Sequence, residues 1–183
     1  VDTRVADYAS LLATLPADTL VHVVGEQESG LAALTQALQG RQGVESVQIL
    51  SHGTLGSFTL GSDTIDAASI GYHRQALQDW AGALTDDADI LLYGCETGAG
   101  EQGMALLTQL AALTGADVAA SNDATGAAVK GGDWELEINT GAIEARLALD
   151  SAAVGSYAHL LAAHAVTNAA PPDAPFTVGE NSG

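Results

Sequence analysis

Short apolar runs and longer amphipathic stretches alternate along most of the chain. Apolar runs bounded by turn residues predict buried strands, and apolar residues spaced three and four apart predict helices. The predicted strands are 20–24, 44–50, 89–93 and 117–120, and the predicted helices are about 5–15, 30–38, 67–84 and 101–114. Ser29 is expected to cap the second helix, and Gly115 to end the last one. This alternation predicts an α/β fold with a mainly parallel sheet, right-handed crossovers and helices on both faces.

Two segments alternate with a period of two residues and predict small β-hairpins. The first is 55–65, with a turn at Gly61-Ser62, and the second pairs 134–138 with 142–147. From residue 166 onward the chain becomes rich in Ala, Asn and Pro, which is typical of a linker. We therefore expect one domain over residues 1–165. Residues 166–183 are expected to form a Pro-rich linker and the start of a following module of a longer protein.

The charge balance excludes several classes of partner. The chain has 23 acidic and 5 basic residues, a formal net charge of −18, so it would repel the phosphates of a nucleic acid or of an anionic membrane. No apolar run approaches the ~18 residues that span a bilayer, so membrane insertion is not expected. A single cysteine permits no internal disulfide. We expect a monomer.

That single cysteine and one histidine stand at comparable places. Strand 44–50 is followed by Ser51-His52-Gly53, and strand 89–93 by Gly94-Cys95. The carboxyl ends of parallel strands meet at one edge of a sheet, where ligands bind in open α/β folds. A thiol beside an imidazole can attack a carbonyl group, and a nearby helix N-terminus favours the thiolate. The alternative is that Cys95 is a small buried apolar residue.

The two strand ends, Ser51-His52-Gly53 and Gly94-Cys95-Glu96-Thr97-Gly98, resemble the motifs of the caspase-like (clan CD) cysteine peptidases. Residues from about 1 to 149 also resemble a domain of unknown function found near the N-terminus of giant bacterial adhesins and RTX-type surface proteins. The tail resembles the start of a cadherin-like repeat. The resemblance implies a caspase-like three-layer sandwich, secreted or on the surface of a bacterium.

The resemblance also implies roles for single residues. His52 would be the general base, Cys95 the nucleophile, and the backbone N–H groups of Gly53 and Cys95 the oxyanion hole. The loop of Ser121, Asn122 and Asp123 would line the pocket for the residue before the scissile bond (P1), which is expected to be basic or Asn. The alternative is that Asp123 only stabilises a turn of the main chain, as an Asx-turn residue.

These roles predict a cysteine endopeptidase that cuts polypeptides, including its own longer chain, for instance near Lys130-Gly131-Gly132. The alternative is a non-catalytic caspase-like cap or binding module of a surface adhesin, because no third group to orient His52 is evident. The chemistry requires no cofactor, and no zinc site is expected. Asp86, Asp87 and Asp89 lack an EF-hand pattern, so calcium on the acidic surface and a helix-ending turn both remain interpretations.

Overall fold

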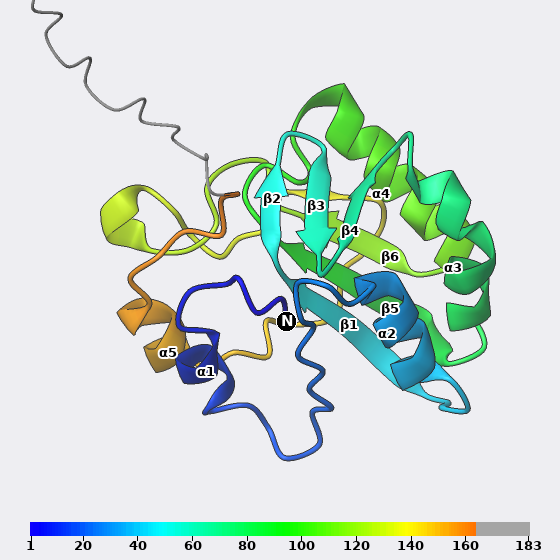
Figure 1. Cartoon of the computed structure of the whole chain (residues 1–183), viewed down its shortest axis with the longest axis horizontal. Helices are drawn as coiled ribbons and strands as arrows, with labels where there is room; N and C mark the ends of the chain where they lie inside the picture. Colours follow the sequence, from blue (N-terminus) through cyan, green and yellow to red (C-terminus); the bar gives the residue numbers. More distant parts are fainter. Residues whose placement is uncertain (164–183) are drawn as a thin grey trace, which may run out of the picture.

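A four-stranded sheet forms the centre of the protein in a computed structural model that describes residues 1–163 (Figure 1). Its strand order is β1 (Val44–Leu50), β5 (Leu84–Tyr93), β6 (Asp117–Ala120) and β7 (Ile138–Asn139). The first three strands run parallel, and β7 runs antiparallel to β6. The predicted α/β fold with a mainly parallel sheet is therefore confirmed.

Both faces of this sheet are covered. Along β5, Ile90 and Leu92 belong to one buried apolar cluster, while Leu91 and Tyr93 belong to another, as the two-residue period of a strand requires. Figure 1 shows α2, α3 and α4 on one side of the sheet and α1 and α5 on the other. The helices are α1 (Tyr8–Leu12), α2 (Gly30–Leu38), α3 (Arg74–Trp80), α4 (Gly100–Thr114) and α5 (Ser151–Ser156).

A second, three-stranded antiparallel sheet follows β1 directly. It consists of β2 (His52–Thr54), β3 (Ser57–Leu60) and β4 (Asp63–Asp66), in that order. The predicted hairpin over 55–65 is confirmed as β3 and β4, which turn at Gly61-Ser62. The predicted caps are also present, because the Ser29 hydroxyl accepts a hydrogen bond from the Ala32 N–H and Gly115 ends α4 in the left-handed region.

Two elements predicted from sequence, strand 20–24 and helix 67–84, do not form as predicted. No strand forms over 20–24: the N–H of Asp2 bonds the Leu50 carbonyl, so the start of the chain occupies the position beside β1. Val24 makes only an isolated bridge with Asp2. The predicted helix 67–84 is shorter and is divided into the 3-10 helix η1 (Ile70–His73) and α3. It does not reach Leu84, because Leu84 begins β5 and pairs with Val44 of β1.

The predicted hairpin of 134–138 with 142–147 is wrong as well. Of this region only β7 is a strand, and its partner is β6. Side chains of the central sheet bind the amides of the following segment: Asp89 accepts hydrogen bonds from the N–H groups of Glu144 and Ala145. These amides therefore need no strand partner.

Helix α5 and the 3-10 helix η2 (Ala128–Lys130) complete the described elements. Within residues 1–163, no helix has the length and apolar character needed to cross a bilayer. The predicted Pro-rich linker and following module, 166–183, lie outside the described residues.

One partly buried hydrogen bond between α2 and α3 gives a test of this packing. The indole N–H of Trp80 donates to the Thr35 hydroxyl at 2.9 Å, and that hydroxyl donates to the Leu31 carbonyl. Thr35→Val should lower the free energy of unfolding by about 1–3 kcal/mol, because the buried Trp80 N–H loses its acceptor. Urea unfolding followed by tryptophan fluorescence measures this.

Thr108→Val is the matched control for Thr35→Val. The Thr108 hydroxyl makes the same bond to the carbonyl four residues earlier but is exposed and bonds no indole. Equal losses in the two variants would contradict a role for the Trp80 bond.

Candidate active site

The parallel pairing of β1 with β5 brings His52 and Cys95 to one edge of the sheet. The strands pair as far as Leu50 and Tyr93, and the N–H of Ser51 still donates to the Tyr93 carbonyl at 3.1 Å. Beyond that point Gly53 packs directly on the backbone of the cysteine turn. A Cβ atom at residue 53 would collide with the Cys95 carbonyl oxygen, so only glycine permits this approach.

A backbone carbonyl orients the ring of His52. Its Nε2 lies 2.9 Å from the carbonyl oxygen of Arg4, which can only accept, so Nε2 carries the proton. In the neutral ring Nδ1 is then the basic nitrogen, and it is buried with no hydrogen-bond partner among the described residues. The third group that the sequence does not reveal is thus the Arg4 carbonyl, and a main-chain atom leaves no signal in a residue pattern.

Asp2 holds this carbonyl in place. Its fully buried carboxylate accepts hydrogen bonds from the backbone N–H and side chain of Arg4 and from the N–H of Gly61, at 2.6–2.9 Å. Burial alone would raise the pKa of Asp2, but the hydrogen bonds and the charge of Arg4 outweigh burial and hold the pKa below its usual value. The ionised carboxylate therefore anchors the segment that orients His52.

The cysteine turn is strained and closed. Glu96, next to Cys95, has a φ of 56°, in the left-handed region that non-glycine residues rarely adopt. The Cys95 side chain is buried, and its Sγ accepts a hydrogen bond from the Thr125 N–H at 3.3 Å. Burial raises the pKa of Cys95, with the Thr125 N–H acting in the opposite direction. Burial thus favours the neutral thiol, against the effect expected from the nearby helix N-terminus.

Two backbone amides beside the thiol point at one oxygen atom. The N–H of Gly53 and the N–H of Cys95 both donate to the carbonyl oxygen of Leu161, at 3.0 and 3.1 Å. Two convergent donors at about 2.7–3.1 Å are the geometry of an oxyanion hole. These are the two N–H groups that the resemblance implies for that role. Nothing in the sequence pattern indicates Leu161, because its contact with Gly53 and Cys95 joins distant parts of the chain.

The loop of Ser121, Asn122 and Asp123 lies against the cysteine turn through its backbone. The N–H of Glu96 donates to the Asp123 carbonyl at 2.7 Å, and the N–H of Gly98 to the Ser121 carbonyl at 2.8 Å. The Ser121 hydroxyl also bonds the Asp123 carboxylate, at 3.2 Å. Ser121 is buried, whereas Asn122 and Asp123 are exposed. The loop thus braces Glu96 and Gly98, and its two exposed side chains face away from the core.

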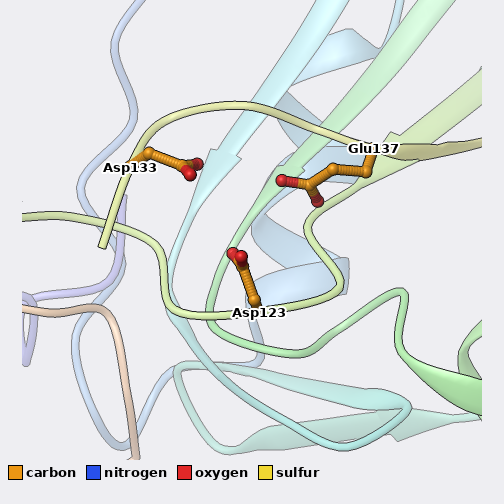
Figure 2. A group of neighbouring side chains, drawn as sticks. All are labelled: Asp123, Asp133 and Glu137. Atoms are coloured by element: carbon orange, nitrogen blue, oxygen red, sulfur yellow. The ribbon is translucent and has the colours of Figure 1, made fainter. Parts of the chain in front are cut away.

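Figure 2 shows the carboxylates of Asp123, Asp133 and Glu137 pointing toward one another. One carboxylate oxygen of each lies within 4.8 Å of the others, and all three residues are exposed. Asp86, Asp87 and Asp89, for which the sequence leaves both calcium and a helix-ending turn open, lie instead within strand β5, so the helix-ending turn is wrong. Asp89 is buried, with one carboxylate oxygen bonded to the Glu144 and Ala145 amides. Calcium binding stays a prediction.

The lowered pKa of Asp2 makes part of the stability dependent on pH. The contribution of the ionised carboxylate is present above the unfolded pKa, near 4, and is lost as the pH falls through the folded pKa. Asp2→Asn should therefore be less stable than the wild type at pH 7, and the difference should shrink below about pH 4. Urea unfolding at pH 7 and pH 3 measures both differences.

Asp86→Asn, at an exposed position, is the control for Asp2→Asn and should leave the free energy of unfolding within about 0.5 kcal/mol at pH 7. A stability difference for Asp2→Asn that is independent of pH would contradict the assignment.

Comparison with known proteins gives a family but no activity. A family model described as a domain of unknown function (DUF4347) matches residues 1–161, and the match ends at the residue whose carbonyl bonds Gly53 and Cys95. No curated protein and no solved structure matches the chain. Because the family model covers most of the sequence, this chain belongs to the DUF4347 family.

Proposed function

We propose that this domain is a cysteine endopeptidase of the caspase-like kind, with Cys95 as nucleophile and His52 as general base. The observation that carries the proposal is the pair of N–H groups, from Gly53 and Cys95, that converge on one carbonyl oxygen beside the only thiol. Such a pair stabilises the negative charge that develops on a carbonyl under attack. A simple buried cysteine needs no such neighbours.

The state of His52 supports the same role. A base must keep one nitrogen free of a proton and be held in orientation through the other. The Arg4 carbonyl holds Nε2, and Nδ1 has no partner among the described residues. The thiol donates to the Thr125 carbonyl at 3.6 Å in this closed state, so in the proposed mechanism its proton passes to His52 Nδ1 only as the sulfur attacks. His52 then returns the proton to the leaving amine.

The biological setting follows the resemblance of the sequence motifs. We propose a domain of a bacterial surface adhesin, secreted or on the cell surface, that acts on polypeptides and not on nucleic acids. The acidic surface, with a formal net charge of −18, supports the exclusion of nucleic acids.

A non-catalytic binding module is the second candidate function. The burial of Cys95 and its raised pKa favour this alternative, because a thiol that never ionises or meets solvent is inert. The two candidates differ in whether any peptide bond is cut when Cys95 is present.

Loss of either catalytic group gives the test. The full chain should cut a proteome-derived peptide library, and Cys95→Ala should abolish the cuts. His52→Ala should slow them by about 10²–10⁴-fold, because the base is lost. Mass spectrometry of the peptides, with calcium or with EDTA, measures the rates and the need for the ion.

The matched control is His73→Ala, on the 3-10 helix η1 and away from the site, which should cut at the wild-type rate. Cuts that persist in Cys95→Ala, or the absence of any cut in the library and in the chain itself, would leave the binding module as the better account.

A further inference from the structure

We propose that the domain cuts its own chain between Leu161 and Ala162. This proposal rests on the proposed peptidase function and names its substrate. Segment 159–163 lies in the candidate active site, with the Leu161 carbonyl oxygen held by the N–H groups of Gly53 and Cys95. That is the position which the carbonyl of a scissile bond must occupy in a peptidase with this oxyanion hole.

The main chain before the bond is held as a substrate strand. The N–H of Leu161 donates to the Thr125 carbonyl at 2.9 Å, and the N–H of Ala127 donates to the His159 carbonyl at 2.8 Å. Leu160 forms an antiparallel bridge with Gly126. These are backbone contacts of an added β-strand, the mode in which extended peptides bind to an exposed edge.

The Thr125 carbonyl also locates the thiol. It accepts hydrogen bonds from the Leu161 N–H at 2.9 Å and from the Cys95 thiol at 3.6 Å, so the thiol and the Leu161 N–H share one acceptor. The opposite end of Leu161 is held by the amide of Cys95 itself. Leu161 is thus held at both ends by groups that also hold or belong to Cys95.

The main chain after the bond is held from the other side of the site. Ala162 forms a parallel bridge with Gly53, and the N–H of Ala163 donates to the Gly53 carbonyl at 3.3 Å. Both alanines are exposed, whereas Leu161 is fully buried. The partners of the segment thus change at Leu161–Ala162, from the 125–127 loop before the bond to the strand that carries His52 after it.

The close approach of the two backbones requires glycine at residue 126. Gly126 has a φ of 128°, and a Cβ atom there would collide with the His159 carbonyl oxygen and lie 3.0 Å from Leu160 Cα. A side chain at this position would push the segment out of the site. The absence of a side chain at residue 126 therefore leaves room for the backbone of residues 159–160.

The side chain before the bond lies in an apolar pocket. Leu161 has no exposed surface and packs in the cluster formed by one face of the sheet, which also contains Leu91, Tyr93 and Cys95. This proposal therefore assigns an apolar P1 residue in place of the basic residue or Asn predicted from sequence. Lys130-Gly131-Gly132 suits cleavage less well, because the N–H groups of all three bond carbonyls of residues 127 and 128 in a tight turn.

A cluster of aromatic rings holds the segment where it enters the site. The ring of Tyr157 lies edge-on to Trp134 and to His159, with centroids 5.6 Å apart in both pairs, and Trp134 also contacts Tyr93 of β5. The Tyr157 hydroxyl donates to the Ala6 carbonyl at 2.9 Å, and burial raises the pKa of Tyr157 to about 12. The Tyr157 hydroxyl and the edge-on ring contacts therefore fix the chain four residues before Leu161.

The reaction balances with water as the only co-reactant. The Cys95 thiol gives its proton to His52 Nδ1, and the sulfur forms a bond to the Leu161 carbonyl carbon. The C–N bond to Ala162 breaks, and the proton passes from His52 to the Ala162 amine. Water then hydrolyses the thioester, which leaves a carboxylate at Leu161 and restores the thiol.

The experiment follows the full 183-residue chain by intact mass and N-terminal sequencing. The wild type should give fragments 1–161 and 162–183, and Cys95→Ala should stay intact. Leu161→Asp should slow the cut at least 100-fold, because a carboxylate enters the apolar pocket. Leu20→Asp, at a leucine that is 58% exposed, is the matched control and should cut at the wild-type rate.

Ala162→Pro keeps the test decisive if Leu161→Asp does not fold. Residue 162 is exposed, and proline there favours the extended backbone of residue 161, so this variant should fold. Proline also changes the nitrogen that must leave in the reaction into a tertiary amide, so the chain should stay intact. Circular dichroism checks the fold of each variant.

The outcomes separate the two proposals. A Cys95-dependent cut at another bond, or cuts in the peptide library with an intact wild-type chain, would overturn the assignment of Leu161–Ala162 and leave the peptidase standing. No Cys95-dependent cleavage of either the chain or the library would remove both proposals.

Discussion

The parallel pairing of β1 with β5 is the constraint on which the rest of the site depends. The register ends with Leu50 opposite Tyr93, so that the two chains leave the sheet side by side and reach His52 and Cys95 within two residues. A shift of one residue would move one chain by about 3.3 Å and turn its side chains to the opposite face. Burial of alternate residues in two separate apolar clusters opposes that shift. The core therefore sets the geometry of the edge.

Beyond the sheet, backbone contacts take over from side-chain packing. The left-handed residue Glu96 carries strain of about 1–3 kcal/mol, which the surrounding structure has to offset. The Glu96 N–H bonds the Asp123 carbonyl, its own carbonyl accepts from Gly56, and Gly53 lies against the turn from the other side. Two separate parts of the chain, residues 53–56 and the loop at Asp123, thus hold one turn. The turn thereby fixes the N–H of Cys95, which points at the Leu161 carbonyl oxygen together with the N–H of Gly53.

The strands and helix caps of this fold could be predicted from sequence, because they depend on residues close together in the chain. Strands 44–50 and 117–120 each end in a buried apolar stretch, and the caps Ser29 and Gly115 have specific local chemistry, so both are visible in the residues. The hairpin over 134–147 is not formed, because Asp89, far away in sequence, binds the amides that would otherwise seek a strand. Local alternation carries no trace of such a competitor.

The site divides in the same way. His52 and Cys95 stand out because each is a reactive residue type directly after a predicted strand. The Arg4 carbonyl, the Thr125 amide and Leu161 do not stand out, because their contributions are main-chain atoms brought together by the tertiary fold. A resemblance in short motifs can therefore suggest His52 and Cys95, but not segment 159–163, whose Leu161 carbonyl bonds Gly53 and Cys95.

The thiol is buried beside segment 159–163 of the same chain, so its burial does not by itself argue against catalysis. A tethered segment reaches the site at a high effective concentration, so a few backbone bonds and one buried leucine are enough to hold it there. Burial raises the pKa of Cys95, and segment 159–163 places the Leu161 carbonyl group against the Cys95 amide. A closed, neutral thiol is therefore compatible with a single intramolecular turnover. Reaction with other polypeptides would instead require segment 159–163 to leave the 125–127 loop and Gly53. Access to the thiol is thus governed by the bonds that hold this strand, rather than by the intrinsic acidity of Cys95.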